Sequence, residues 1–145
     1  MIIPDVNLLL YATITTFEEH AEAREWFSAA LNGEVQVLLP GVAVFGFVRI
    51  ATNPRIFESP IAVTDAVASV ETWLAQPHVH FLSPGPRFTD IAFDLLRKLG
   101  TAGNLTTDVQ LAAHAIENQA TLYSRDTDFA RVPGLRWVDP LKPGR

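Results

Sequence analysis

Four acidic side chains occupy positions where carboxylates could together hold a metal ion. Asp5 follows Pro4 at the end of the apolar run at residues 1–3, and Asp108 lies in the first turn of the helix-like segment TTDVQLAAHAIE. Two more acids, Asp126 and Asp128, follow an apolar run in the motif YSRDTDF. In an α/β protein the ends of strands and the starts of helices meet at one edge of the sheet. Carboxylate oxygens are hard ligands that suit Mg²⁺ or Mn²⁺, so the pattern predicts a divalent-metal site.

Polar and basic residues near these acids fit the same chemistry. Asn7 would point in the direction of Asp5 if the chain stays extended, and Thr107 and Ser124 could hydrogen-bond beside the later acids. Three arginines could bind a phosphate backbone through paired N–H groups: Arg49, Arg55 and Arg125. Hydrolysis of a phosphodiester by a metal-activated water is the reaction that this set of residues favours.

Each acid also has an alternative structural role. Asp5 and Asn7 could cap the turn that follows them, and Asp126 and Asp128 could form an Asx-type turn. Asp108 could be an acid that interacts favourably with the dipole of its own helix, and the arginines could be surface residues without a partner. Three acidic edges in one short chain favour the metal site over three independent turns.

Other chemistries have less support in the sequence. The chain has no cysteine, which excludes disulfides and thiolate metal sites, and its glycines follow neither the Walker nor the G-x-G-x-x-G spacing. His78 and His80 alternate on an expected strand, but no further ligand lies near them in the sequence. Glu117 lies nine residues after Asp108, on roughly the opposite side of a helix, and is expected to face solvent.

The hydrophobic pattern predicts strands that alternate with helices. Expected strands cover residues 1–3, 35–39, 78–82, 120–124 and 135–138. Expected helices cover residues 17–31, 42–51, 65–75, 89–99 and 107–118. This order predicts an α/β fold with a central, mostly parallel sheet flanked by helices. The loop at residues 59–64 is the one candidate for a lid.

Composition sets the broad class. With 145 residues, 48% hydrophobic content and 19% charged residues, we expect a single globular domain over residues 1–145. The net charge of −5 disfavours a simple nucleic-acid binder. The start of the chain has no basic leader, and the apolar stretch at residues 35–51 is interrupted and shorter than the ~20 residues that cross a bilayer. We therefore expect a cytoplasmic protein without a membrane partner.

Three motifs resemble those of PIN-domain ribonucleases of the VapC toxin type: DVNLLLYA, GFVRIATNPRIF and TTDVQLAAHAIENQATLYSRDTDF. The last is the most specific, and the resemblance covers nearly the whole chain. It implies a PIN-like three-layer sandwich, a homodimer, Mg²⁺- or Mn²⁺-dependent endoribonuclease activity on RNA, and inhibition by a cognate antitoxin protein. Within the matching motifs, Asp5, Asp108 and Asp126 correspond to the catalytic metal-binding acids. Asp128 is an additional metal-binding acid, and the supporting polar residues are Asn7, Thr107 and Ser124.

The sequence departs from this family at one position. Where these proteins commonly have a Glu on the helix after the second strand, this chain has Gly46, and residues 42–52 contain no acid. Fewer carboxylates weaken metal binding. An alternative is therefore a metal-poor PIN-like module that binds RNA or a protein partner without cutting. A phosphatase with Asp5 as its nucleophile is a weaker alternative, because such enzymes place a second acid two residues later.

Overall fold

The computed structural model describes residues 1–100, 103 and 105–141. The strands are β1 (Ile2–Pro4), β2 (Val37–Pro40), β3 (Val79–Leu82), β4 (Thr121–Tyr123) and β5 (Trp137–Val138). The α-helices are α1 (Val6–Thr13), α2 (His20–Asn32), α3 (Gly41–Ala51), α4 (Val63–Leu74), α5 (Phe88–Leu99) and α6 (Leu105–Glu117). A short 3₁₀ helix, η1 (Thr127–Arg131), follows β4.

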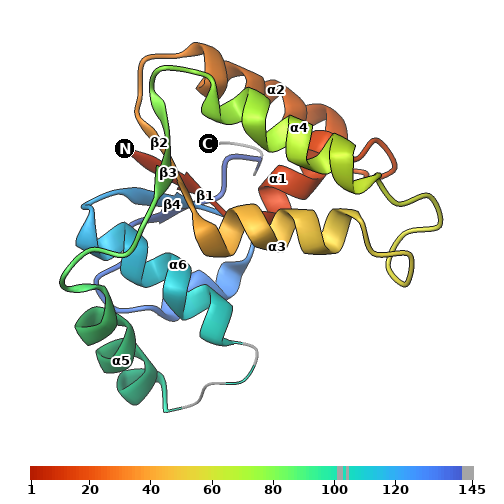
Figure 1. Ribbon diagram of the computed structural model, residues 1–145. Helices are drawn as coiled ribbons and strands as arrows, with labels where there is room; N and C mark the ends of the chain where they lie inside the picture. The colour runs from red at the N-terminus through yellow and green to blue at the C-terminus, as the bar shows by residue number, and fades with distance from the viewer. Residues whose placement is uncertain (101–102, 104, 142–145) are drawn as a thin grey trace.

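The five strands form one sheet in the order β3-β2-β1-β4-β5, and every neighbouring pair is parallel. Helices α1, α2 and α4 lie on one side of the sheet and α5 and α6 on the other, while α3 runs between the two groups (Figure 1) and contacts both α1 and α6. The expected α/β sandwich with a parallel sheet is therefore confirmed. Since β1 is central, its carboxyl end lies between those of β2 and β4.

Two of the inner strands, β1 and β2, are short apolar runs that end in proline. All four residues of β2 are buried, and Ile3 in β1 and Leu122 in β4 have no exposed surface. Pro4 and Pro40 are the last residues of β1 and β2. A helix begins within two residues of each proline, so the chain turns sharply after both strands at the carboxyl edge of the sheet.

Helix α1 was not predicted from the sequence. Its buried residues include Val6, three consecutive leucines and Ala12, so the helix is apolar on most sides and shows no amphipathic pattern. Asn7 consequently lies in the first turn of a helix, and the expectation of an extended chain there is wrong.

The prediction that Glu117 faces solvent is also wrong. Its carboxylate accepts hydrogen bonds from the backbone N–H groups of Gly85 at 2.9 Å and Arg87 at 2.8 Å. The loop before α5 thus covers the face of α6 opposite Asp108. Glu117 holds the start of α5 in place because two backbone donors converge on one carboxylate.

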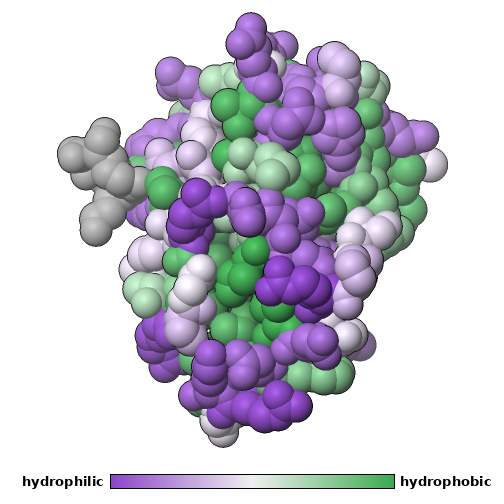
Figure 2. All heavy atoms as spheres, turned by 90° about the vertical axis from the view of Figure 1, so that its left-hand side faces the viewer, coloured by the Kyte–Doolittle hydropathy of each residue, from purple (hydrophilic) through white to green (hydrophobic). Residues whose placement is uncertain are grey.

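The face at the amino ends of the strands is shown in Figure 2, where hydrophilic residues surround a smaller apolar area. In the described parts of the chain, no helix has the length and apolar character needed to cross a membrane. The acids of interest lie at the other end of the sheet, at the carboxyl ends of the strands.

Candidate active site

A cavity of about 440 Å³ opens at the carboxyl edge of the sheet. Three acids from distant parts of the chain line it: Asp5 after β1, Asp108 in the first turn of α6, and Asp126 after β4. Asn7 and Thr107 line the same cavity. The fold therefore brings together three of the four acids named from the sequence, because β1 and β4 are neighbours in the sheet and α6 packs against both.

Asp5 is held by a hydrogen bond that crosses the sheet. The hydroxyl of Ser124 donates to Oδ2 of Asp5 at 2.7 Å and accepts the backbone N–H of Asp126 at 3.0 Å. Ser124 has no exposed surface, and Asp5 is only 6% exposed. The backbone N–H groups of Val6 and Asn7, at the start of α1, also interact with the Asp5 carboxylate and favour its charged form.

Asp126 combines two roles. Its Oδ1 accepts the backbone N–H of Asp128 at 2.9 Å and so caps η1, which is the Asx-type turn considered from the sequence. The same residue lines the acidic cavity. Asp128 is exposed and lies instead in a small neighbouring cavity that Asp108 also borders. Its metal-binding role remains a prediction.

The acids repel one another in the absence of a cation. Burial, together with the negative charges of Asp5, Asp126 and Asp128, raises the pKa of Asp108 from 3.8 to about 6, and burial is the largest cause. Burial also raises the pKa of Asp5, while the hydrogen bond from Ser124 opposes the change. Such raised values mark a functional-site candidate that needs positive charge.

The donor set suits a hard cation. Among the described residues, no group of three His, Cys, Asp or Glu side chains stands close enough to hold an ion by direct bonds alone. Mg²⁺ keeps several of its waters and is commonly bound by one or two carboxylates. The oxygen-only lining and the unbalanced negative charge therefore fit a hydrated Mg²⁺ or Mn²⁺.

One face of α3 completes the cavity and carries no acid. The cavity-lining residues from this helix are Val42, Phe45, Gly46, Arg49 and Ile50. Gly46 thus lies at the site, and an ideal Cβ there would be 3.2 Å from Cγ2 of Val6. Sequence reasoning missed Phe45, although an aromatic residue four positions before Arg49 in one helix shares its face.

The three arginines named from the sequence have different surroundings. Arg49 lines the acidic cavity, whereas Arg55 does not. Arg55 is exposed and donates its backbone N–H to Asn53 at 2.9 Å. Arg125 pairs with Asp139, with 3.3 Å between Nε and Oδ2. Arg49 is therefore the arginine of the three that is placed to meet a phosphate beside the acids.

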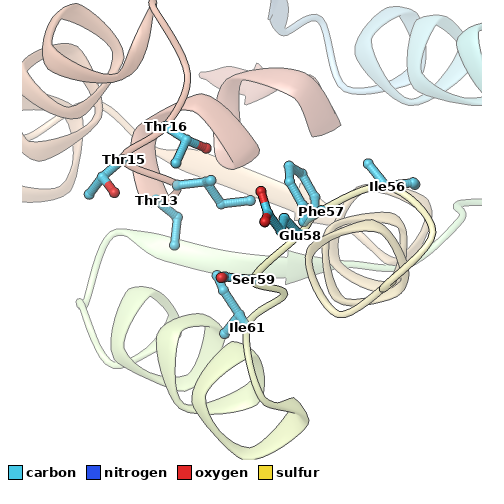
Figure 3. A pocket seen from close by; sticks show the side chains of 9 residues that line it. Thr13, Thr15, Thr16, Ile56, Phe57, Glu58, Ser59 and Ile61 are labelled. Atoms are coloured by element: carbon cyan, nitrogen blue, oxygen red, sulfur yellow. The ribbon is translucent and has the colours of Figure 1, made fainter.

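A second cavity, of about 510 Å³, lies away from the acids. Figure 3 shows side chains from the end of α1 and from the loop before α4 around it, among them Thr13, Phe57, Glu58 and Ile61. Glu58 is its single carboxylate, which is too few for a hard-cation site. The candidate lid at residues 59–64 contributes Ser59 and Ile61 here and lines this cavity instead of the acidic one.

The parallel sheet and the acids at the carboxyl ends of its strands define an α/β protein with an acidic site suited to a divalent cation. A family model described as "PIN domain" matches residues 2–135. The chain is 54% identical over 142 residues to "Ribonuclease VapC33" of Mycobacterium tuberculosis, covering 98% of this chain and 99% of the relative. It is 40% identical over 140 residues to "Ribonuclease VapC37" of the same organism, covering 97% of each. The chain therefore belongs to the PIN-domain family, within its VapC type.

Solved structures show the same fold at lower identity. VapBC-1 from nontypeable Haemophilus influenzae matches with a TM-score of 0.69 and 22% identity, over 98% of this chain and 100% of that chain. VapC20 of Mycobacterium tuberculosis, described as a "Sarcin-Ricin loop cleaving toxin", matches with a TM-score of 0.69 and 15% identity, over 94% and 99% of the two chains. These structures support the three-layer architecture described above.

Proposed function

We propose that this protein is a Mg²⁺- or Mn²⁺-dependent endoribonuclease, the toxin component of a toxin–antitoxin pair. The observation that carries the proposal is the gathering of Asp5, Asp108 and Asp126 in one cavity at the carboxyl edge of the sheet. The names of the two curated relatives, both ribonucleases matched over almost their full length, support it.

The chain's own residues have distinct roles in this proposal. Asp5, Asp108 and Asp126 hold the cation, in part through its bound waters, and Asp128 adds negative charge beside Asp108. Bound there, Mg²⁺ or Mn²⁺ supplies a Lewis acid and an acidic bound water for attack on a phosphodiester. Ser124 keeps Oδ2 of Asp5 in a fixed position through its buried hydrogen bond. A fixed acceptor costs no reorganisation during the reaction.

Neutral and positive groups around the acids contact the RNA. Asn7 and Thr107 line the cavity and offer hydrogen-bond donors to phosphate or water. Arg49 supplies the positive charge for the RNA backbone at the cavity itself. Arg55 and Arg125 lie outside this cavity, so we assign them at most a contact with RNA further from the cut.

Protein partners are part of the same proposal. One solved neighbour is described as a "Toxin-antitoxin complex from Klebsiella pneumoniae", with 16% identity and a TM-score of 0.64, covering 97% and 98% of the two chains. By analogy, we propose a cognate antitoxin that binds this chain and a homodimer as its assembled state. Inhibition of cutting by a co-expressed antitoxin, and the mass of the purified protein, test these two points.

A non-cutting PIN-like module is the second candidate. The observation that favours it is Gly46, which lines the cavity beside the three acids. Proteins of this family commonly have a Glu at this position, so this chain has one carboxylate fewer at the site. Under this alternative, RNA or a protein partner binds at the cavity without hydrolysis.

Cleavage of a mixed pool of structured RNA by purified protein in Mg²⁺, Mn²⁺ or EDTA distinguishes the two candidates. We expect metal-dependent cutting that Asp5→Asn and Asp108→Asn each abolish. Asp94→Asn is the matched control, because Asp94 is exposed, pairs with Lys98 and does not line the cavity. RNA binding without cutting in either metal would favour the module, and full activity of either variant would remove that residue from the site.

A further inference from the structure

Every polar atom of Ser124 takes part in a hydrogen bond. On one side, its hydroxyl donates to Asp5 and accepts the backbone N–H of Asp126. On the other side, its backbone N–H donates to the carbonyl of Val138 at 3.0 Å, and its own carbonyl accepts the indole Nε1–H of Trp137 at 2.9 Å. Ser124 is therefore the residue at which the acids of the cavity are joined to strand β5.

The residue after Ser124 is held by the chain just beyond β5. Nε of Arg125 lies 3.3 Å from Oδ2 of Asp139, and Oδ1 of the same carboxylate accepts the backbone N–H of Leu141 at 3.0 Å. The side chain of Asp139 is only 9% exposed, so solvent screens this pair less than an ion pair on the open surface. Two consecutive residues after β4, Ser124 and Arg125, are thus anchored to residues 137–139.

This anchoring bears on the direction of the chain as it leaves β4. The peptide group that joins Ser124 to Arg125 cannot rotate freely, because its carbonyl is held by Trp137. Asp126 is bonded to the Ser124 hydroxyl through its N–H, so a rotation at this peptide group would change its place relative to Asp5. An indole suits such an anchor because its N–H can only donate.

We propose that Trp137 and Asp139 are positioning residues for the acidic cavity. Neither lines the cavity, and they act by holding residues 124–125 from the side of β5, which fixes where the carboxylates of Asp5 and Asp126 lie. The inference rests on the proposed function for the metal, whereas the anchoring itself involves no cation. Groups that orient metal ligands commonly change metal affinity about 10- to 100-fold when they are removed.

The competing explanation is that Trp137 only fills space. Its ring is partly buried and packs against the core, so loss of ring area alone would lower stability. Trp26 allows this effect to be separated, since its indole also contacts β4 by stacking on Tyr123. A change from Trp to Phe reduces ring area at both positions, but at residue 137 it also leaves the carbonyl of Ser124 without its indole donor.

Amide hydrogen exchange of the full-length protein in EDTA tests the anchoring without metal. We expect Trp137→Phe to lower the protection of residues 124–128 about 2- to 10-fold, the change that corresponds to loss of one hydrogen bond. Protection of β2 should not change, because that strand has no part in the anchoring. Trp26→Phe is the matched control and should leave residues 124–128 as protected as in the unsubstituted protein.

The role of Asp139 is tested in the same exchange experiment. Asp139→Asn keeps an oxygen that can accept the N–H of Leu141 but removes the charge that faces Arg125. We expect a smaller loss of protection at residues 124–128, in the same direction as for Trp137→Phe. Asp94→Asn, which removes the charge from the exposed pair with Lys98, should have no effect there, and equal results for the two Asn variants would remove Asp139 from the proposal.

Isothermal titration calorimetry with Mn²⁺ tests the consequence for the acids. We expect Trp137→Phe to weaken Mn²⁺ binding about 3- to 10-fold, which is less than for Ser124→Ala because Trp137 acts one hydrogen bond further from the carboxylate. If Trp137 acts through Ser124, the double variant should lose less affinity than the product of the two single effects. A residue that only fills space would lower the unfolding temperature and leave the Kd of the folded protein unchanged.

Two results would overturn the inference. One is equal exchange at residues 124–128 in Trp137→Phe and Trp26→Phe, which would show that the indole hydrogen bond does not hold this segment. The other is faster exchange in Trp137→Phe with an unchanged Kd for Mn²⁺, which would leave β5 as a structural support only. Absence of Mn²⁺ binding by the unsubstituted protein would instead refute the proposed metal site, while faster exchange in Trp137→Phe would still support the anchoring.

Discussion

Replacing Gly46 by Glu should tighten the binding of Mn²⁺. Gly46 lines the cavity that holds Asp5, Asp108 and Asp126, so a side chain at this position starts inside the acidic site. The helix backbone favours the change, because Gly in a helix interior is about 1 kcal/mol less favourable than Ala. Against this gain stands the new Cβ, which would lie 3.2 Å from Cγ2 of Val6 and require that side chain to move by a few tenths of an ångström.

The expected magnitude follows from the charges. A carboxylate about 4 Å from a cation gains about 4 kcal/mol per unit charge at an effective dielectric constant of about 20. Desolvation of the new carboxylate and its repulsion by three acids offset most of this, since the pKa of Asp108 is already raised to about 6 by its burial and its acidic neighbours. We therefore expect a net gain of about 1.4 kcal/mol, or about tenfold in the Kd for Mn²⁺.

Isothermal titration calorimetry of Mn²⁺ against Gly46→Glu, Gly46→Gln and Gly46→Ala separates the contributions. Gln has the size of Glu without its charge, and Ala tests the contact of the Cβ with Val6. Only Glu should tighten binding, and without metal it should unfold at a lower temperature than Gln because of the added repulsion. Equal Kd values for the Glu and Gln variants would refute the reasoning that this position lacks a metal-binding acid.

Three further predictions concern the acids and their supports. The pKa of Asp108 is higher in the folded protein than the ordinary 3.8, so its ionisation destabilises the metal-free fold as pH rises from about 4 to about 6, and stability below that range is unaffected. That pKa difference corresponds to about 3 kcal/mol, but the side chain is partly exposed, so solvent screens much of the effect. Asp108→Asn should therefore stabilise the metal-free protein by about 1 kcal/mol at pH 7, as measured by urea unfolding in EDTA. An unchanged pH dependence of unfolding in this variant would contradict the prediction. Ser124→Ala should destabilise by about 2 kcal/mol and reduce cutting, because it removes the side-chain donor that serves the buried carboxylate of Asp5. Ser69→Ala, whose hydroxyl makes an exposed hydrogen bond within α4, should change little, and equal losses in the two variants would argue against a positioning role. Glu117→Gln should speed amide hydrogen exchange in the loop before α5, whose two N–H groups lose a charged acceptor, and exchange at the unsubstituted rate would show that the carboxylate is dispensable.

The sequence predicted the alternation of strands and helices because these elements depend on local patterns. The buried strand β2 is a continuous apolar run, and α3 follows Pro40 directly. The acids at Asp5, Asp108 and Asp126 could be named for the same reason, since each follows a strand or begins a helix. Helix α1 escaped prediction because its surface is apolar on most sides, and periodicity is visible only where one face is polar.

The partners of individual side chains were decided by tertiary structure alone. Ser124 donates a hydrogen bond to Asp5, 119 positions away in the sequence, and Arg125 pairs with Asp139. Neither partner can be predicted from the residues next to it in the sequence. Glu is a common residue on exposed helix faces, yet a loop about 30 residues earlier in the chain donates two backbone hydrogen bonds to Glu117. The residue types therefore determined which chemistry is available. The packing of distant segments determined which groups share a cavity, how strongly they interact, and that Phe45 lies open beside them.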